Sequence, residues 1–326
     1  MTATAEKWQA DLAEGFGTAE ELLRYLGLDT NLASAEAVRL FPFRVPRSYA
    51  NRMGRGDAAD PLLRQVLPLA SEARSVPGFV SDPVGDRRAV VAPGLLHKYR
   101  GRVLLITSGA CPIHCRYCFR REFPYGESQL TRQAEGSAIA YIEGNRDIEE
   151  VILSGGDPLL LGDVRLGRLF RLLETIPHLK RVRIHSRVPV VLPSRITRGL
   201  AEILRSQRLP IIVVIHANHP REIDAEVGAA LSRLREAGVT LFNQAVLLRG
   251  VNDDEETLIR LSEALFAHQV HPYYLHVLDR VRGTAHFEVA EEHAVALYEA
   301  LRQRLPGYLV PRLVRELEGE PYKVLL

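Results

Sequence analysis

The sequence predicts an α/β fold, built as a parallel barrel or as an open part of one. From Arg102 onward, short apolar and β-branched runs alternate with segments of helical periodicity. Strands separated by helices pair in parallel through right-handed crossovers. The chain has 326 residues, of which 46% are hydrophobic, and is therefore long enough to bury the core of a barrel-sized unit.

Six strands and the helices between them follow from these patterns. The predicted strands are 103–107, 150–154, 181–186, 211–217, 240–246 and 273–277. The clearest helices between them are 165–174, 195–205, 222–236 and 255–267. Parallel barrels collect their ligand contacts at the carboxyl ends of the strands. The residues that follow each predicted strand are therefore the first candidates for a functional site.

The N-terminal region has a different pattern and predicts a helical, loop-rich extension. Thr18 and Glu21 predict a capping box at the start of an amphipathic helix, and Gly27 predicts its end. This region carries no motif that points to chemistry on its own. The predicted division of the chain is an N-terminal extension at 1–95, a barrel at 96–305 and a C-terminal segment at 306–326 that closes the site.

Cys111, Cys115 and Cys118 stand in one run directly after the first predicted strand, and the chain contains no other cysteine. Their C-x3-C-x2-C spacing suits three corners of a 4Fe–4S cluster whose fourth iron is open to another ligand. Scattered cysteines are usually buried apolar residues, and an odd number this close together cannot form a disulfide framework. A structural zinc site with His114 as the fourth ligand is the remaining alternative from spacing alone.

Other polar residues also follow or close predicted strands. They are Ser154-Gly155-Gly156-Asp157 after the second strand, His216 at the end of the fourth, Gln244 in the fifth and Asp279 after the sixth. Each is a position at which a barrel places ligand contacts. The structural alternative for Ser-Gly-Gly-Asp is a tight turn in which Asp157 caps a helix, and for His216 it is a hydrogen-bonded core residue.

Composition narrows the class of protein. The net charge of +2 is almost balanced and no basic block is interleaved with aromatic residues, which argues against a nucleic-acid partner and favours a small molecule. No apolar run reaches the ~18 residues needed to span a membrane, and the first residues show no signal-peptide pattern. We therefore expect a cytoplasmic protein without membrane contact. Lysine occurs only at Lys7, Lys98, Lys180 and Lys323.

The cysteine spacing and the Gly-Gly-acid turn together resemble those of the radical S-adenosylmethionine (SAM) enzymes. Longer runs narrow the resemblance to lysine 2,3-aminomutases; these runs are 102–106, 118–121, 154–159, 187–193, 243–252 and 274–279. Further runs resemble the short bacterial members that make β-lysine for the modification of elongation factor P; these are 43–48, 60–67, 93–99 and 319–323. The resemblance therefore extends over nearly the whole chain.

The resemblance implies a partial (βα)6 radical SAM barrel and an isomerase that moves the amino group of L-lysine from C2 to C3. It implies a 4Fe–4S cluster on the three cysteines, together with SAM and pyridoxal 5'-phosphate (PLP). The residues that it assigns to SAM are Ser154, Gly155, Gly156, Asp157, His216 and Gln244. It assigns Lys323 to a Schiff base with PLP, and Lys98 and Arg102 to the pyridoxal or its phosphate. Without the resemblance, Lys323 would be interpreted as part of a solvated tail.

The resemblance also assigns the substrate contacts. Arg120 matches the arginine that binds the substrate carboxylate, and Asp279 and Glu316 match the acids that receive the distal amine. Two carboxylates suit lysine and would repel glutamate. The alternatives are a glutamate or arginine 2,3-aminomutase and a zinc-stabilised module without catalysis. The resemblance further implies an external electron donor and a functional link to an elongation factor P ligase.

Overall fold

One ten-stranded sheet organises the fold. The computed structural model describes residues 6–326. The strands are β1 (Val90–Ala92), β2 (Leu95–Tyr99), β3 (Arg102–Ser108), β4 (Glu150–Gly155), β5 (Arg181–Ser186), β6 (Ile211–Ile215), β7 (Thr240–Val246), β8 (His271–His276), β9 (Arg312–Arg315) and β10 (Val324–Leu325). They lie side by side in chain order. Strands β3 to β9 are parallel, and β1, β2 and β10 add antiparallel edges.

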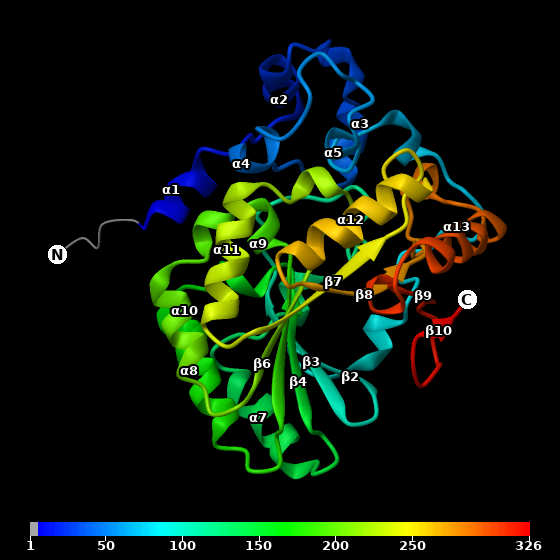
Figure 1. The fold of residues 1–326 in the computed structure, drawn as a ribbon. Coiled ribbons are helices and arrows are strands. Elements are labelled where there is room, and N and C mark those ends of the chain that lie inside the picture. The colour runs from blue at the N-terminus through cyan, green and yellow to red at the C-terminus, as the bar shows by residue number, and fades with distance from the viewer. Residues whose placement is uncertain (1–5) are drawn as a thin grey trace.

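Helices follow most of the parallel strands and cover the outside of the curved sheet (Figure 1). The α-helices are α1 (Lys7–Ala13), α2 (Ala19–Leu26), α3 (Ala35–Leu40), α4 (Arg47–Ala50), α5 (Pro61–Arg64), α6 (Tyr125–Ser128), α7 (Glu135–Gly144), α8 (Asp163–Glu174), α9 (Val188–Val191), α10 (Arg198–Arg205), α11 (Ala225–Glu236), α12 (Glu255–Ala267) and α13 (Glu291–Arg304). Within residues 6–326 no strand pairing joins β1 to β10, so the barrel is partial, as predicted.

All six predicted strands are confirmed as β3 to β8, and β5 and β7 have the predicted ends. Two predicted helices begin later than expected. The helix predicted at 195–205 begins at Arg198 because the Thr197 side chain accepts a hydrogen bond from the Leu200 amide and caps it. The helix predicted at 222–236 begins at Ala225, because Asp224 caps it in the same way.

The C-terminal part contains structure that the sequence analysis missed. Helix α13 precedes β9, which pairs in parallel with β8 as a seventh parallel strand. Strand β10 then turns back and pairs antiparallel with β9, with Val324 opposite Arg315. This hairpin adds the end of the chain to the edge of the sheet beside β9 (Figure 1).

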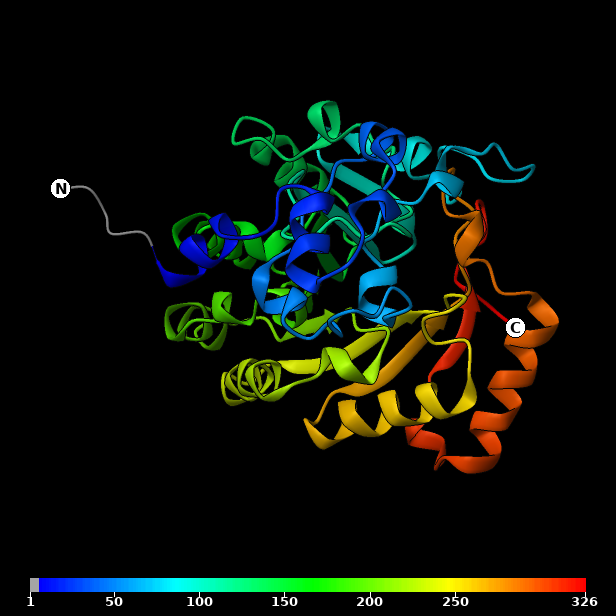
Figure 2. The ribbon, with the colours of Figure 1, turned by 90° about the horizontal axis from the view of Figure 1, so that it is seen from above.

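The N-terminal extension gathers at one end of the barrel, where Figures 1 and 2 show α2 to α5 beside the loops that follow the strands. Helix α2 has the predicted capping box between Thr18 and Glu21, and Gly27 ends it with a φ of 71°. Two backbone hydrogen bonds tie the cysteine loop to the extension, from the His114 amide to Arg44 O (3.0 Å) and from the Arg116 amide to Gln65 O (2.9 Å).

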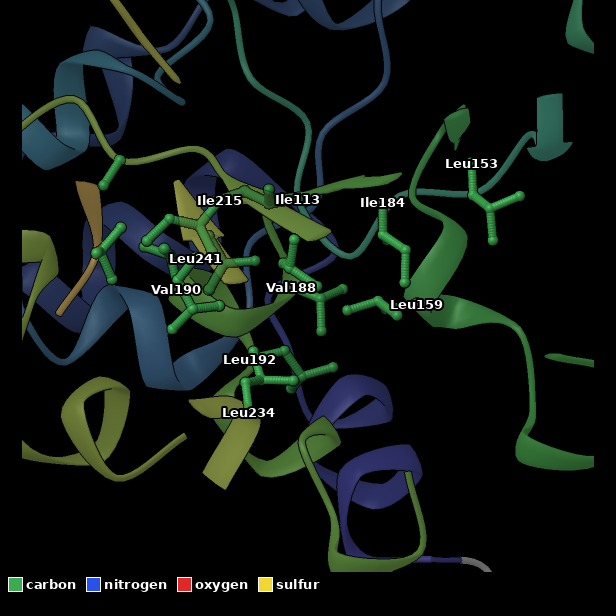
Figure 3. Close-up of a cluster of buried hydrophobic side chains, with 14 of the residues drawn as sticks. Ile113, Leu153, Leu159, Ile184, Val188, Val190, Leu192, Ile215, Leu234 and Leu241 are labelled. Atoms are coloured by element: carbon green, nitrogen blue, oxygen red, sulfur yellow. The ribbon is translucent and has the colours of Figure 1, made fainter. Parts of the chain in front are cut away.

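One large hydrophobic core spans the extension and the barrel. Figure 3 shows part of it, with Ile184 and Leu159 close to Val188. Leu22 and Leu62 of the extension belong to the same cluster and are fully buried. No helix within residues 6–326 combines the length and apolar character needed to cross a bilayer.

Candidate active site

A cavity of about 900 Å³ lies among the parallel strands and the loops at one end of the barrel. Every residue that the resemblance assigned to the cluster, to a cofactor or to the substrate lines this cavity. These residues are Cys111, Cys115, Cys118, Lys98, Arg102, Arg120, Ser154, Gly155, Gly156, Asp157, His216, Gln244, Asp279, Glu316 and Lys323. The fold therefore gathers side chains that are more than two hundred positions apart in the sequence at one site.

The three cysteines lie on the loop that directly follows β3, and all three are free thiols. Burial raises the pKa of Cys118 to about 11, and it also raises that of Cys111 well above its usual value. Near neutral pH these groups therefore stay protonated unless a bound metal takes the place of the proton.

No three His, Cys, Asp or Glu side chains in the described part of the chain converge as ligands of a single ion would. Each cysteine of an iron–sulfur cube holds a different iron, so the three thiols of such a site need not converge on one point. His114 lies against Phe41, and its Nδ1 is 3.1 Å from Pro42 O.

The cysteine loop is fixed from the side of the N-terminal extension by a buried ion pair. Arg116 Nη2 lies 2.6 Å from Glu72 Oε2, and both side chains are fully buried. Arg121 also contacts Glu72 at 2.8 Å, and Arg116 donates to carbonyl oxygens of residues 37, 41 and 42. Because Arg116 lies between two of the cysteines, this network sets the position of the loop.

The Ser-Gly-Gly-Asp turn packs directly on the residues that lead into Cys111. The Gly156 amide donates to Ser108 O at 2.7 Å, and the Asp157 amide donates to Ala110 O at 2.8 Å. A Cβ atom on Gly155 or on Gly156 would meet these backbone oxygens at 2.4 or 2.3 Å. Glycine is therefore required here by the close approach of two backbone segments.

Asp157 holds the next turn in place. Its carboxylate accepts hydrogen bonds from the Ser186 hydroxyl (2.8 Å) and from the amides of Leu159 (3.0 Å) and Arg187 (2.8 Å). Burial raises the pKa of Asp157 to about 6 in spite of these bonds. The structural role that the sequence analysis gave as an alternative, a helix cap, is therefore present: Asp157 caps the 3₁₀ turn Pro158–Leu160.

His216 and Gln244 lie on the cavity wall, just after β6 and in β7 respectively. His216 Nε2 lies 3.4 Å from Nδ1 of His185, a residue of β5 that lines the same cavity. Burial, followed by the charges of Arg187 and Arg120, lowers the pKa of His216 to about 3. His216 is therefore neutral at physiological pH and can accept or donate a hydrogen bond.

A line of alternating charges crosses the cavity. Its five members in order are Arg120, Asp86, Lys98, Glu316 and Lys323, joined by contacts of 2.7, 3.4, 2.6 and 2.6 Å. Arg120 also donates from Nη1 to the Ser154 hydroxyl at 3.0 Å. Each buried charge therefore has a partner, as the cost of burial requires.

Lys323 enters this line because the β9–β10 hairpin turns the chain back. Glu316 directly follows β9 and Lys323 directly precedes β10, so that the two side chains face each other. Burial opposes the charge of Glu316, but the ammonium groups of Lys323 and Lys98 outweigh it and lower the pKa. Lys323 Nζ also lies over the ring of Tyr274, 5.8 Å from its centroid.

Asp279 lies just after β8 and lines the same part of the cavity. Burial, together with the nearby charge of Glu316, raises its pKa to about 7. Its charge therefore changes near physiological pH, and a cation that binds beside it stabilises the ionised form.

The structure offers polar groups that a bound PLP could use besides Lys323. The guanidinium of Arg102 lies over the Tyr99 ring, 4.3 Å from the centroid, and forms no ion pair with any side chain that the structure describes. His276 Nε2 is buried on the cavity wall without a hydrogen-bond partner in the described part of the chain. An amine, an available cation and an unpartnered ring nitrogen in one cavity fit a phosphorylated aldehyde cofactor.

Sequence reasoning missed Asp86 and gave no role to His185, Arg187 or His276. Asp86 lies in a stretch that reads as loop, and no local pattern shows that it pairs with Arg120 at 2.7 Å. Arg187 belongs to one of the runs that carried the family resemblance. Its contact with Cys115 depends on the packing of β5 against the cysteine loop, which no spacing in the sequence predicts.

Comparison with known proteins agrees with this geometry. The model of the radical SAM superfamily matches residues 105–262. L-lysine 2,3-aminomutase of Escherichia coli (strain K12) is 48% identical over 100% of this chain and 96% of its own length. The enzyme of that name from Haemophilus influenzae is 44% identical over 98% and 95% of the two lengths. The one from Clostridium subterminale is 35% identical over 96% and 76%. The chain therefore belongs to the lysine 2,3-aminomutase family of radical SAM enzymes.

Proposed function

We propose that this protein is an L-lysine 2,3-aminomutase, which moves the α-amino group of L-lysine to C3 and so forms β-lysine. The observation that carries the proposal is the arrangement of charge in one cavity. Arg120 lies at one end of the charged line, and two acids, Asp279 and Glu316, line the same cavity as the amine of Lys323. Free lysine needs an anion-binding group for its carboxylate and an acidic site for its distal ammonium.

Residues that line this cavity would bind three cofactors. Cys111, Cys115 and Cys118 would hold the 4Fe–4S cluster, and the turn at 154–157 with His216 and Gln244 would contact SAM. Lys323 would bind PLP, with Lys98 and Arg102 beside its pyridoxal or phosphate. When bound, the cluster and SAM supply a radical that removes hydrogen from an unactivated carbon, and PLP supplies the carbonyl group that carries the migrating amine.

The role of the protein is then to position the substrate. Arg120 uses Nε for Asp86 and Nη1 for Ser154, and its Nη2 has no partner among the groups that the structure describes. Nη2 therefore remains to donate to a carboxylate, and Asp86 keeps the guanidinium in place. Arg120 on the cysteine loop would hold one end of the substrate, and Asp279 and Glu316, which follow β8 and β9, would hold the other, which would fix C3 relative to the reacting groups.

Glu316 gives the distal ammonium a defined place. Glu316 Oε2 is 2.6 Å from Lys323 Nζ. The Glu316 carboxylate, which faces the ammonium groups of Lys98 and Lys323, is an acidic group that can also attract the ε-ammonium of the substrate. Glutamate carries a carboxylate in that position, and both acids would repel it.

The cellular setting is part of the same proposal. We infer a cytoplasmic enzyme that takes electrons from an external donor and supplies β-lysine to a ligase that modifies elongation factor P. The likeness of residues 43–48, 60–67 and 319–323 to the short bacterial members supports this setting. The reducing cytoplasm also keeps the cysteines available as thiols.

Turnover of competing amino acids tests the proposal. Reconstituted protein is incubated without oxygen with SAM, PLP, a reductant and either L-lysine, L-glutamate or L-arginine, and the β-amino acids are quantified. β-Lysine should form fastest by kcat/KM, and Cys111→Ala protein should form none of the three products. Faster release of β-glutamate or β-arginine would reject lysine as the substrate. Protein that binds zinc and neither iron nor sulfide would reject the catalytic function itself.

A further inference from the structure

Arg187 is a buried arginine whose guanidinium points at a cysteine of the cluster loop. It follows β5 directly, is 5% exposed, and its Nη1 is 2.6 Å from Cys115 Sγ. Among the hydrogen bonds within residues 6–326, this is the one that joins a charged side chain to a cysteine sulfur. A guanidinium is always charged at physiological pH.

Further hydrogen bonds hold the Arg187 guanidinium in this position. Its Nη2 donates to Gln65 Oε1 at 2.6 Å, to Glu222 Oε2 at 3.0 Å and to the Tyr49 hydroxyl at 3.1 Å. Glu222 is fully buried and is the single carboxylate that pairs with Arg187 in the described structure. The guanidinium therefore cannot leave Cys115 without breaking a buried network.

Two of these contacts come from the N-terminal extension. Tyr49 belongs to α4, and Gln65 directly follows α5. Gln65 also accepts a hydrogen bond from Asn218 Nδ2 (3.1 Å), and its Nε2 donates to Glu222 Oε1 (3.1 Å). The extension, which carries no chemical motif of its own, thus fixes the orientation of a cation beside the cluster loop.

We propose that Arg187 is a positioning residue that makes the cluster easier to reduce. Reduction adds one negative charge to an iron–sulfur cluster, and hydrogen bonds to its sulfur ligands stabilise that charge. A cation at the Cys115 sulfur therefore favours the reduced state, whereas the nearby Glu222 opposes it. The inference rests on the part of the proposed function in which Cys115 holds the cluster. It does not depend on which amino acid is the substrate.

Two charge-changing variants should shift the reduction potential in opposite directions. Arg187→Met removes the cation and the donor, so at a fixed applied potential the ratio of reduced to oxidised cluster should fall about tenfold, or 59 mV for a one-electron couple. Glu222→Gln removes the opposing anion and should raise that ratio. Arg187→Lys keeps the charge without the planar fork and should lie between wild type and Arg187→Met. His114→Gln changes the cysteine loop without touching a sulfur and should leave the ratio unchanged.

The measurement is a titration of each reconstituted protein with titanium(III) citrate, followed by electron paramagnetic resonance of the reduced cluster. Iron and sulfide contents are determined in parallel. If Arg187→Met does not retain a cluster, the double variant Arg187→Met/Glu222→Gln, which removes both buried charges, takes its place. The ratio of reduced to oxidised cluster in the double variant should be lower than in Glu222→Gln alone. The inference would be overturned if all cluster-containing variants had the same reduction potential. It would also be overturned if removing the Arg187 charge and removing the Glu222 charge shifted the potential in the same direction. Wild-type protein without iron and sulfide would instead overturn the cluster assignment.

Discussion

Burial controls the charge of single side chains in this cavity. Asp279 and Glu316 are both acidic residues of the same wall, but their pKa values move in opposite directions. Glu316 has two ammonium groups at 2.6 Å, whereas Asp279 has no ion-pair partner within residues 6–326 and is raised to about 7 by burial and by Glu316. Asp279 is therefore the acid whose charge depends on pH near neutrality.

We expect the KM for L-lysine to fall as the pH rises through about 7, because Asp279 attracts the ε-ammonium when its carboxyl is ionised and not when it is protonated. Asp279→Asn should raise KM about 10- to 100-fold at pH 8, the loss expected for one hydrogen bond to a charged group, and should flatten the pH dependence. KM is measured between pH 6 and 9, with Asp147→Asn, an exposed residue, as the control. A flat wild-type profile, or the same slope in Asp279→Asn, would contradict this role.

The residues that sequence reasoning found are those that belong to local patterns. The cysteine spacing and the Gly-Gly-acid turn could be recognised because neighbouring residues act together, and Arg120 stands within such a run. Asp86 and Arg187 could not be assigned, since their partners lie 34 and 72 positions away. Long-range contacts between single polar residues leave no local trace in a sequence.

At the scale of elements, the turn after β4 and the loop after β3 form one unit. Gly155 and Gly156 allow the two backbones to approach within hydrogen-bonding distance, and Asp157 links the turn to the start of α9. The position of Cys111 therefore depends on residues that lie outside the cysteine loop.

Gly156→Ala should displace Ala110 and lower the cluster content, because its Cβ would meet a backbone oxygen at 2.3 Å. The free energy of unfolding should fall by about 1–3 kcal/mol, the usual cost of overpacking. Gly162→Ala is the matched control, since nothing lies within 4 Å of its Cβ position. Iron and sulfide analysis and urea denaturation measure both effects. Full cluster content in Gly156→Ala would show that the close approach is dispensable.

The barrel elements were predictable because each strand carries its own apolar run between turn residues. The β9–β10 hairpin was not, since β10 has two residues, one of them exposed, and its sequence resembles a solvated end. Its formation depends on pairing with β9, which in turn depends on β8. The hairpin decides where Lys323 lies. By resemblance, the sequence could give the identity of this residue and a C-terminal segment that closes the site, but not the strand pairing that holds it there.

At the scale of the whole molecule, the N-terminal extension is part of the active-site scaffold. It shares the hydrophobic core with the barrel and contacts the cysteine loop through Glu72, Gln65 and Arg44. The sequence analysis predicted its helical character without assigning it a role, because its contribution consists of long-range backbone contacts and of single polar side chains that no local pattern marks. These side chains are Tyr49, Gln65, Glu72 and Asp86.

Glu72→Ala should destabilise the protein strongly, because it leaves Arg116 and Arg121 buried without a counter-charge. The expected loss in the free energy of unfolding is about 3–5 kcal/mol, measured by urea denaturation. Glu149→Ala is the comparison: Glu149 pairs with Lys180 on the surface, and its loss should leave the denaturation midpoint unchanged. Equal midpoints for the two variants would mean that the extension does not support the loop.

Trapping of PLP on the protein tests the central claim most directly. Protein loaded with PLP is reduced with sodium borohydride, digested and analysed by mass spectrometry for the pyridoxyl-modified peptide. The account predicts one modified residue, Lys323, and no modification in Lys323→Arg, which keeps the charge beside Glu316 but cannot form an imine. Modification at Lys98 or Lys180 instead, or none in the wild-type protein, would contradict the account.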